Sequence, residues 1–192
     1  MRRTLLYLLI ILVCLATVQN IVAANITFKD EKVKELCVAN WDTDNDGELS
    51  EHEAAMVKSL GDVFRNNREI VSFSELQHFK GLNGICSFAF NGCTALKEVS
   101  LPESLTKIGY LSFGDCAALE SICIPKTVTC ISNSSFAYCI SLKSIKVEKG
   151  NAVYDSRNNC NGIVETATGI LILGCKTTVI PESVTAVTNN TF

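Results

Sequence analysis

The sequence predicts an α/β solenoid: an array of short parallel strands, with a small helical segment before it and a β-hairpin inserted near its end. Three observations predict this class. A 23-residue period runs from about residue 85, apolar residues at helical spacing flank an acidic loop at 42–53, and two β-rich runs face each other near residue 167. The length of 192 residues and the apolar content of 47% allow one ordinary domain with a substantial core.

Residues 1–24 have the pattern of a secretory signal peptide. Arg2 and Arg3 precede an apolar run at 5–18, and small residues at 22–24 predict cleavage after Ala24. An uncleaved membrane anchor is the alternative interpretation. We therefore expect a secreted or cell-surface protein that meets the membrane only through its export signal.

Charge and chemistry exclude several classes of function. Cleavage after Ala24 removes two of the 17 basic residues and none of the 20 acidic ones, which leaves a net charge near −5. Without a basic stripe, nucleic acid is not an expected partner. The two histidines, His52 and His78, form no Ser/His/Asp or Cys/His set with supporting context, and no glycine-rich phosphate loop is present. We expect neither an enzyme nor a small-molecule substrate.

Residues 25–68 predict a helix–loop–helix cap. In the stretch 29–41, Val33, Leu36, Cys37 and Trp41 share about one helical face. After the loop, an amphipathic pattern continues over the residues Ala54, Val57, Leu60 and Phe64.

The loop between these helices matches the calcium pattern D-x-[DN]-x-[DN]-G-x₅-E at every position. Carboxylates at loop positions 1, 3, 5 and 12 can surround a hard cation, while position 7 offers a backbone carbonyl and position 9 binds directly or through water. The predicted ligands are Asp42, Asp44, Asp46, Glu48, Ser50 and Glu53. We predict a structural calcium ion here; an acidic turn that matches by accident is the alternative.

Residues 69–192 predict the repeats, with a degenerate first unit at 69–84 and regular units over 85–150. Equivalent residues recur every 23 positions, which lies within the range of leucine-rich repeats. The recurring sets are Ile85, Ile108, Ile131; Phe90, Phe113, Phe136; Cys93, Cys116, Cys139; Leu96, Leu119, Leu142; and Val99, Ile122, Ile145. One unit cannot bury its apolar face alone, so stacking must bring these sets into columns.

Each unit predicts a short strand with one buried face. Val99 and Leu101 alternate with polar residues, and Pro102 ends the run. The outward positions are small or mixed in charge: Lys97, Glu98, Ser100, Glu120, Ser121, Cys123, Lys143, Ser144 and Lys146. Such a sheet offers an extended concave surface for a protein ligand, although a merely solvated face is the alternative.

The cysteines follow the repeat. Nine remain after export, and three of them stand in one column, where they cannot all pair. We interpret Cys93, Cys116 and Cys139 as buried thiols.

The period is interrupted at 151–178. Residues 162–165 and 169–173 are β-rich and separated by "TAT", which predicts a hairpin. Its arms could bring Cys160 near Cys175, either as a disulfide or as stacked thiols. The repeat resumes at 179–192 and breaks off at Phe192, which we interpret as a truncated array.

The stretch 89–109 and its copies resemble the BspA-type, or treponema-type, leucine-rich repeat proteins. Residues 154–181 look like a hairpin insertion of that family, and 38–55 is similar to an EF-hand- or dockerin-like leader. The resemblance implies an exported or surface-displayed binding module, of which several members adhere to host matrix proteins such as fibronectin or fibrinogen. Full members carry many more repeats. The alternative is a dockerin-like attachment module fused to a truncated, non-binding array, although dockerins use two calcium segments and this chain has one.

Overall fold

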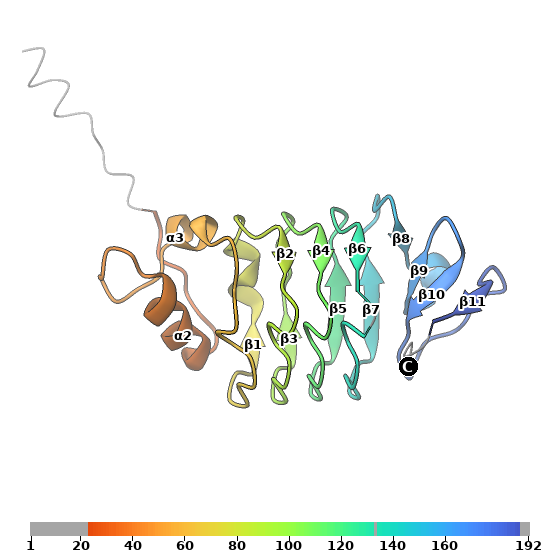
Figure 1. The fold of residues 1–192 in the computed structure, drawn as a ribbon, viewed down its shortest axis with the longest axis horizontal. Coiled ribbons are helices and arrows are strands. Elements are labelled where there is room, and N and C mark those ends of the chain that lie inside the picture. The colour runs from red at the N-terminus through yellow and green to blue at the C-terminus, as the bar shows by residue number, and fades with distance from the viewer. Residues whose placement is uncertain (1–22, 133, 189–192) are drawn as a thin grey trace, which may run out of the picture.

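The computed structural model describes residues 23–132 and 134–188. The predicted signal peptide, apart from its last two residues, and Phe192 lie outside these ranges. Two helices stand at one end of the molecule, the strands of the repeats follow side by side, and a separate small sheet stands at the other end (Figure 1). None of the helices in the described ranges is long and apolar enough to span a bilayer.

The helical cap consists of α2 (Glu31–Trp41) and α3 (Glu51–Met56). The second helix is shorter than predicted, and its expected continuation through Phe64 is wrong. The chain turns away from the helix after Met56, and Gly61 adopts a left-handed φ of 55°. Leu60 and Phe64 are nevertheless fully buried, because the irregular segment carries them into the core of the repeats.

Asp30 joins the cap to the array. As N-cap of α2 it accepts hydrogen bonds from the backbone N–H groups of Lys32 and Val33, and its other oxygen accepts from those of Val71 (2.5 Å) and Ser72 (3.2 Å). Partial burial raises the pKa of this carboxyl, but the four N–H groups lower it further, and the pKa lies below its ordinary value.

The repeats form two rows of parallel strands (Figure 1). One row holds the predicted strands, and the other row was not predicted from the sequence. The first row is β1 (Ser72–Phe73), β3 (Glu98–Val99), β5 (Ser121–Ile124) and β7 (Ser144–Val147). The second row is β2 (Gly84–Ile85), β4 (Lys107–Ile108) and β6 (Cys130–Ile131). A short 3₁₀ helix, η1 (Ser74–His78), completes the degenerate first unit.

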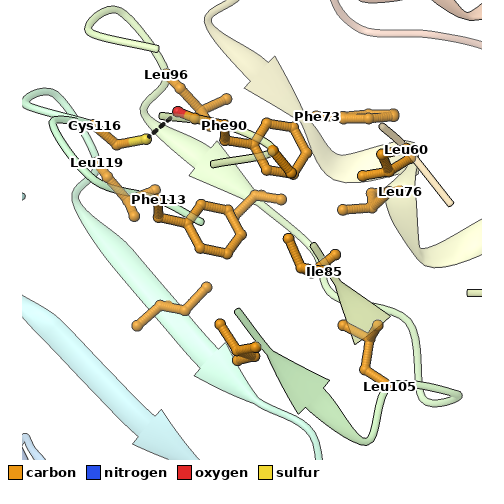
Figure 2. Packing of buried hydrophobic residues seen from close by; sticks show 14 of the residues in the cluster. Leu60, Phe73, Leu76, Ile85, Phe90, Leu96, Leu105, Phe113, Cys116 and Leu119 are labelled. Carbon is orange, nitrogen blue, oxygen red and sulfur yellow. Dashed lines mark hydrogen bonds between the residues drawn. The ribbon is translucent and has the colours of Figure 1, made fainter. Parts of the chain in front are cut away.

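A column of phenylalanine rings fills the space between the rows, as Figure 2 shows for two of its members. Phe90 and Phe113 are stacked with centroids 5.1 Å apart, and Phe113 and Phe136 with centroids 5.2 Å apart. Phe64 begins this column, 5.2 Å from Phe90, although it stands 26 residues before it rather than 23. The predicted columns are therefore confirmed, and they start within the segment assigned to the cap.

The cysteine column also is confirmed as free thiols. Each thiol donates to a backbone carbonyl of the preceding unit: Cys93 to Phe64 (3.0 Å), Cys116 to Phe90 (3.2 Å) and Cys139 to Phe113 (3.1 Å). Cys93 and Cys116 are fully buried, and Cys139 is half-buried. A small side chain with one weak donor suits this place, because it fills little space and satisfies one carbonyl.

Beyond β7 the chain builds a four-stranded sheet in the order β11-β10-β9-β8. The predicted hairpin is confirmed, since β9 (Ile163–Glu165) and β10 (Ile170–Leu173) pair in antiparallel fashion. It is flanked by β8 (Tyr154–Asp155) and β11 (Ala186–Val187), and a 3₁₀ turn, η2 (Arg157–Asn159), follows β8.

Asn161 closes the free edge of β7. Its side-chain oxygen accepts from the N–H of Ile145 (2.6 Å), and its side-chain nitrogen donates to the carbonyl of Lys143 (2.6 Å). Ser156 accepts from the N–H of Val147 (3.0 Å) in the same way. Side chains thus take the place of the strand that a further regular repeat would add.

Candidate interaction face and metal-binding loop

The row β1–β3–β5–β7 presents the polar face that the sequence predicts. Isoleucines such as Ile122 and Ile145 point into the core, while Cys123 and Lys146 between the buried positions are exposed. Backbone hydrogen bonds continue the face from strand to strand, for example from the N–H of Glu120 to the carbonyl of Lys97 (3.0 Å). The predicted outward positions are exposed or half-buried, so their orientation is confirmed.

Two hollows mark this face. The first, of 510 Å³, lies across the ends of β3 and β5. Its lining consists of Gln77, Lys80, Val99, Ser100, Leu101, Glu103, Ser104, Cys123, Pro125 and Glu148. The second, of 730 Å³, lies over β7, β8 and η2, and Glu148 borders both hollows.

Some charges on the face are paired across the units. Lys143 lies 3.7 Å from Glu120, and Lys126 lies 3.9 Å from Glu103. Lys29 of the cap pairs with Glu98 on β3, and Ser72 also donates to that carboxylate (2.7 Å). These contacts are exposed, so each contributes no more than about 1 kcal/mol. They set the charge pattern of the surface but add little to the stability of the fold.

The acidic loop brings three of its six predicted ligands together. One carboxylate oxygen from each of Asp42, Asp44 and Asp46 lies within 4.8 Å of the other two. That separation suits oxygens around one hard cation, because ligands at about 2.4 Å from an ion lie at most about 4.8 Å apart. Asp42 also accepts from the N–H groups of Asn45 (2.7 Å) and Gly47 (3.0 Å), which shape the turn.

The other three predicted ligands have different partners. Glu53 accepts from the N–H and hydroxyl of Ser50, both at 2.9 Å, and from the N–H and hydroxyl of Thr43 at 2.7 and 2.8 Å. Ser50 is the N-cap of α3, so Ser50 and Glu53 form a capping box. The carboxylate of Glu48 pairs with Lys34 at 2.7 Å, which does not involve the backbone carbonyl predicted as its ligand atom.

The pKa values of the loop carboxyls separate the same two groups of residues, since the pKa of Asp44 is raised and that of Glu53 is lowered. The N–H of Asp46 lowers the pKa of Asp44, but desolvation and repulsion by Asp46, Glu53 and Asp42 outweigh it, and the pKa is raised. Burial raises the pKa of Glu53, but the N–H and hydroxyl groups of Ser50 and Thr43 outweigh burial and lower it to about 2. A cation would relieve the repulsion at Asp44, whereas the negative charge of Glu53 is already stabilised by hydrogen bonds.

The loop is held from outside by residues on both sides of the predicted cleavage site, Ala24 before it and Ile26 after it. The N–H of Ile26 donates to the carbonyl of Leu49 (2.8 Å), and that of Glu51 donates to the carbonyl of Ala24 (2.9 Å). Asn25 and Ser50 thereby form an isolated antiparallel bridge. Leu49, the apolar residue of the loop, is fully buried and anchors the loop to the core.

Cys160 and Cys175 are both free thiols. Cys160 belongs to a small cluster with Val164 and Leu171, whereas Cys175 packs against the main core. Cys175 receives a hydrogen bond from the side chain of Asn161 (3.4 Å). In this structure the pair therefore stands as two thiols, which is one of the two interpretations that the sequence left open.

The sequence does not predict the residues that line the second hollow beyond β7. Lys149, Asn151 and Arg157 fall in the interrupted segment or at its border, where the period offers no guide to orientation. The run "LKSIKVEKG" at 142–150 held one usable signal, since lysines recur there every third residue.

A sequence model described as "BspA type Leucine rich repeat region" matches residues 62–167, in six copies. The chain belongs to this BspA-type leucine-rich repeat family. The match begins before the predicted end of the cap at residue 68 and takes in Phe64, in agreement with the start of the phenylalanine column. It does not include the acidic loop. No curated protein matches the chain.

Two solved structures of bacterial repeat proteins are similar to the chain. A leucine-rich cell surface protein from Faecalibacterium prausnitzii A2-165 shares 26% identity with a TM-score of 0.50, over 58% of this chain and 28% of its own. A leucine-rich repeat protein from Eubacterium ventriosum ATCC 27560 shares 19% identity with a TM-score of 0.41, over 65% of this chain and 43% of its own. The chain therefore spans less than half the length of either protein.

Proposed function

We propose that this BspA-type protein is a secreted or cell-surface binding module, without catalytic activity, that binds proteins such as those of a host extracellular matrix. The observation that carries the proposal is the outward face of β1–β3–β5–β7. It presents a continuous row of exposed small and charged side chains with two hollows of 510 and 730 Å³.

Three further points support the proposal. A repeat sheet offers a long surface whose side chains can vary without disturbing the core columns. The leader pattern at 1–24 predicts export. The similar protein from Faecalibacterium prausnitzii is described as a cell surface protein.

The test is direct binding of the mature chain, residues 25–192, to immobilised host matrix glycoproteins. We expect saturable binding that Ser121→Arg weakens by about tenfold or more, because the new side chain would stand in the middle of the face. Ser87→Arg, also at an exposed serine but outside that row of strands, is the matched control and should bind as the wild type does. An equal loss of binding in both variants, or no binding by the wild type itself, would contradict this function.

We also propose that the loop 42–53 binds a structural calcium ion through Asp42, Asp44 and Asp46. The convergence of their carboxylates and the raised pKa of Asp44 support a cation there. The backbone carbonyl of Glu48 remains a proposed ligand. Ser50 and Glu53 would have to exchange their capping hydrogen bonds for the ion, so we expect them to bind it weakly or through water.

Calcium should raise the melting temperature of the mature chain by a few degrees relative to chelator, because binding free energy adds to folding free energy. Asp44→Asn should abolish the increase. Asp115→Asn makes the same chemical change at an exposed aspartate of the array and should retain it. An identical melting temperature in calcium and in chelator would exclude the ion.

A further inference from the structure

We propose that the hollow over β7 and β8 binds an acidic segment of a protein partner. The inference rests on the proposed binding function and names the chemistry of one part of the ligand. Four cationic side chains line this hollow, namely Lys143, Lys146, Lys149 and Arg157, against the two carboxylates of Glu148 and Asp155. The surplus of positive charge is notable on a chain whose net charge is −3.

The contacts of these side chains show which charges are available to a ligand. Arg157 is taken up by Asp155, since its Nε and terminal nitrogen donate to the two carboxylate oxygens at 2.8 and 2.7 Å. Lys146 and Lys149 are exposed and form no ion pair within the described part of the chain. Lys143 has only its exposed contact with Glu120 at 3.7 Å. Three ammonium groups can therefore turn to a ligand at little cost.

The backbone N–H groups on the floor of the hollow already have hydrogen-bond partners, so they are not available to a ligand. Asn161 and Ser156 occupy the N–H groups of Ile145 and Val147 along the edge of β7. A partner would therefore not extend the sheet by pairing its backbone with this edge. Recognition would come instead from side-chain charges above the floor, which favours carboxylates over an extended apolar strand.

Two features favour a protein segment over a polyanionic chain. Glu148 and Asp155 place hydrogen-bond acceptors within the hollow, to which the backbone N–H groups of a peptide can donate, whereas the phosphate or sulfate groups of nucleic acid or a sulfated polysaccharide would meet only repulsion from them. The only aromatic side chain in the lining, that of Tyr154, is 5% exposed, and its hydroxyl accepts a hydrogen bond from the N–H of Ile131 at 3.1 Å. The lining thus offers no aromatic platform on which bases or sugar rings could stack.

The test uses the mature chain and two labelled peptides, octaglutamate and octaglutamine, with binding followed by fluorescence anisotropy at low and physiological salt. We expect saturable binding of octaglutamate that weakens as salt is added, and no binding of octaglutamine. The double variant Lys146→Gln/Lys149→Gln should weaken octaglutamate binding by about tenfold, as expected for the loss of two exposed charge contacts.

The double variant Lys107→Gln/Lys176→Gln is the matched control. It removes the same net charge at two exposed lysines outside the lining of the hollow and should change the affinity less than about twofold. Equal weakening by both double variants would mean that only net charge matters, and would overturn the inference. Absence of octaglutamate binding, or binding of a sulfated oligosaccharide in its place, would overturn it also.

The same variants separate this inference from the proposed function. In one outcome, matrix glycoproteins bind, Ser121→Arg weakens that binding, and octaglutamate does not bind. The proposed binding face is then supported, and the proposed acidic ligand is wrong. If octaglutamate binds at Lys146 and Lys149 while no matrix glycoprotein binds, the hollow stands and the matrix partner is wrong.

Discussion

The regular repeats and the resumed repeat near the end of the chain share a local sequence but differ in burial. The run "IPKTVTCI" at 124–131 recurs as "IPESVTAV" at 180–187. Ile124 is fully buried and Ile131 is 9% exposed, whereas Ile180 is 51% exposed and Val187 is 52% exposed. The same apolar pattern therefore produces core in one place and surface in another.

The neighbours of each strand explain the difference. β5, which contains Ile124, lies between β3 and β7, so its inward side chains are covered from both sides (Figure 1). β11, which contains Val187, pairs with β10 on one edge and is the outermost strand of its sheet. In a solenoid, burial comes from the units on either side and not from the unit itself.

The largest loss of stability should follow Phe113→Ala. Phe113 is fully buried and stacked between Phe90 and Phe136, so its removal leaves a large cavity and should cost about 3–5 kcal/mol. Tyr138→Ala, at an aromatic residue that is 74% exposed, should cost less than about 0.5 kcal/mol. Urea unfolding followed by circular dichroism measures both, and a similar cost for the two would refute the column as the core.

Truncation of equivalent isoleucines tests the comparison itself. Ile124→Ala should destabilise by about 2–5 kcal/mol, and Ile180→Ala by less than about 1 kcal/mol, because the second side chain is half in water already. The measurement is again the free energy of unfolding in urea. Equal effects would show that the resumed repeat is covered in solution as the regular ones are.

Asn161→Asp should weaken the closure of β7. The substitution keeps an acceptor and tolerates the left-handed φ of 57°, but it loses the amide that donates to Lys143 and Thr177. We expect a loss of about 1–2 kcal/mol. Asn159→Asp, at an exposed residue with a φ of 53°, adds the same charge and is the control, expected within about 0.5 kcal/mol of the wild type. Hydrogen exchange at the N–H of Ile145 should rise only in the first variant.

The smallest expected effect is the loss of stability of the helical cap as the pH falls. Glu53 has its pKa lowered from 4.5 to about 2, so it contributes stability above about pH 4.5 and loses that contribution as the pH falls toward 2. Glu53→Gln should lower the melting temperature at neutral pH by about 2–4 °C and flatten its decline with acid. Trp41, the single tryptophan, packs 5.5 Å from Phe79 and reports the cap by fluorescence. A pH profile unchanged by the substitution would contradict this role.

Particular residues show how far the sequence predicts the fold and the sites. The columns of phenylalanine, the thiols at Cys93 and Cys116, and the hairpin of β9 and β10 all followed from spacing. The second row of strands did not, because two-residue strands such as β4 carry too few residues to show a period. Glu53 fits both a metal loop and a capping box, and only the folded loop shows which hydrogen bonds it makes.

By itself, the sequence determined which residues of each unit face inward, because apolar and small side chains recurring every 23 residues leave one way to bury them together. It also determined that three aspartates share one turn. The tertiary structure alone decided that Asn161 closes the free edge of β7, that the lysines of β7 gather over β8, and that Ile180 is half exposed. Those outcomes depend on which segments become neighbours in space, and the local sequence of a segment does not contain its neighbours.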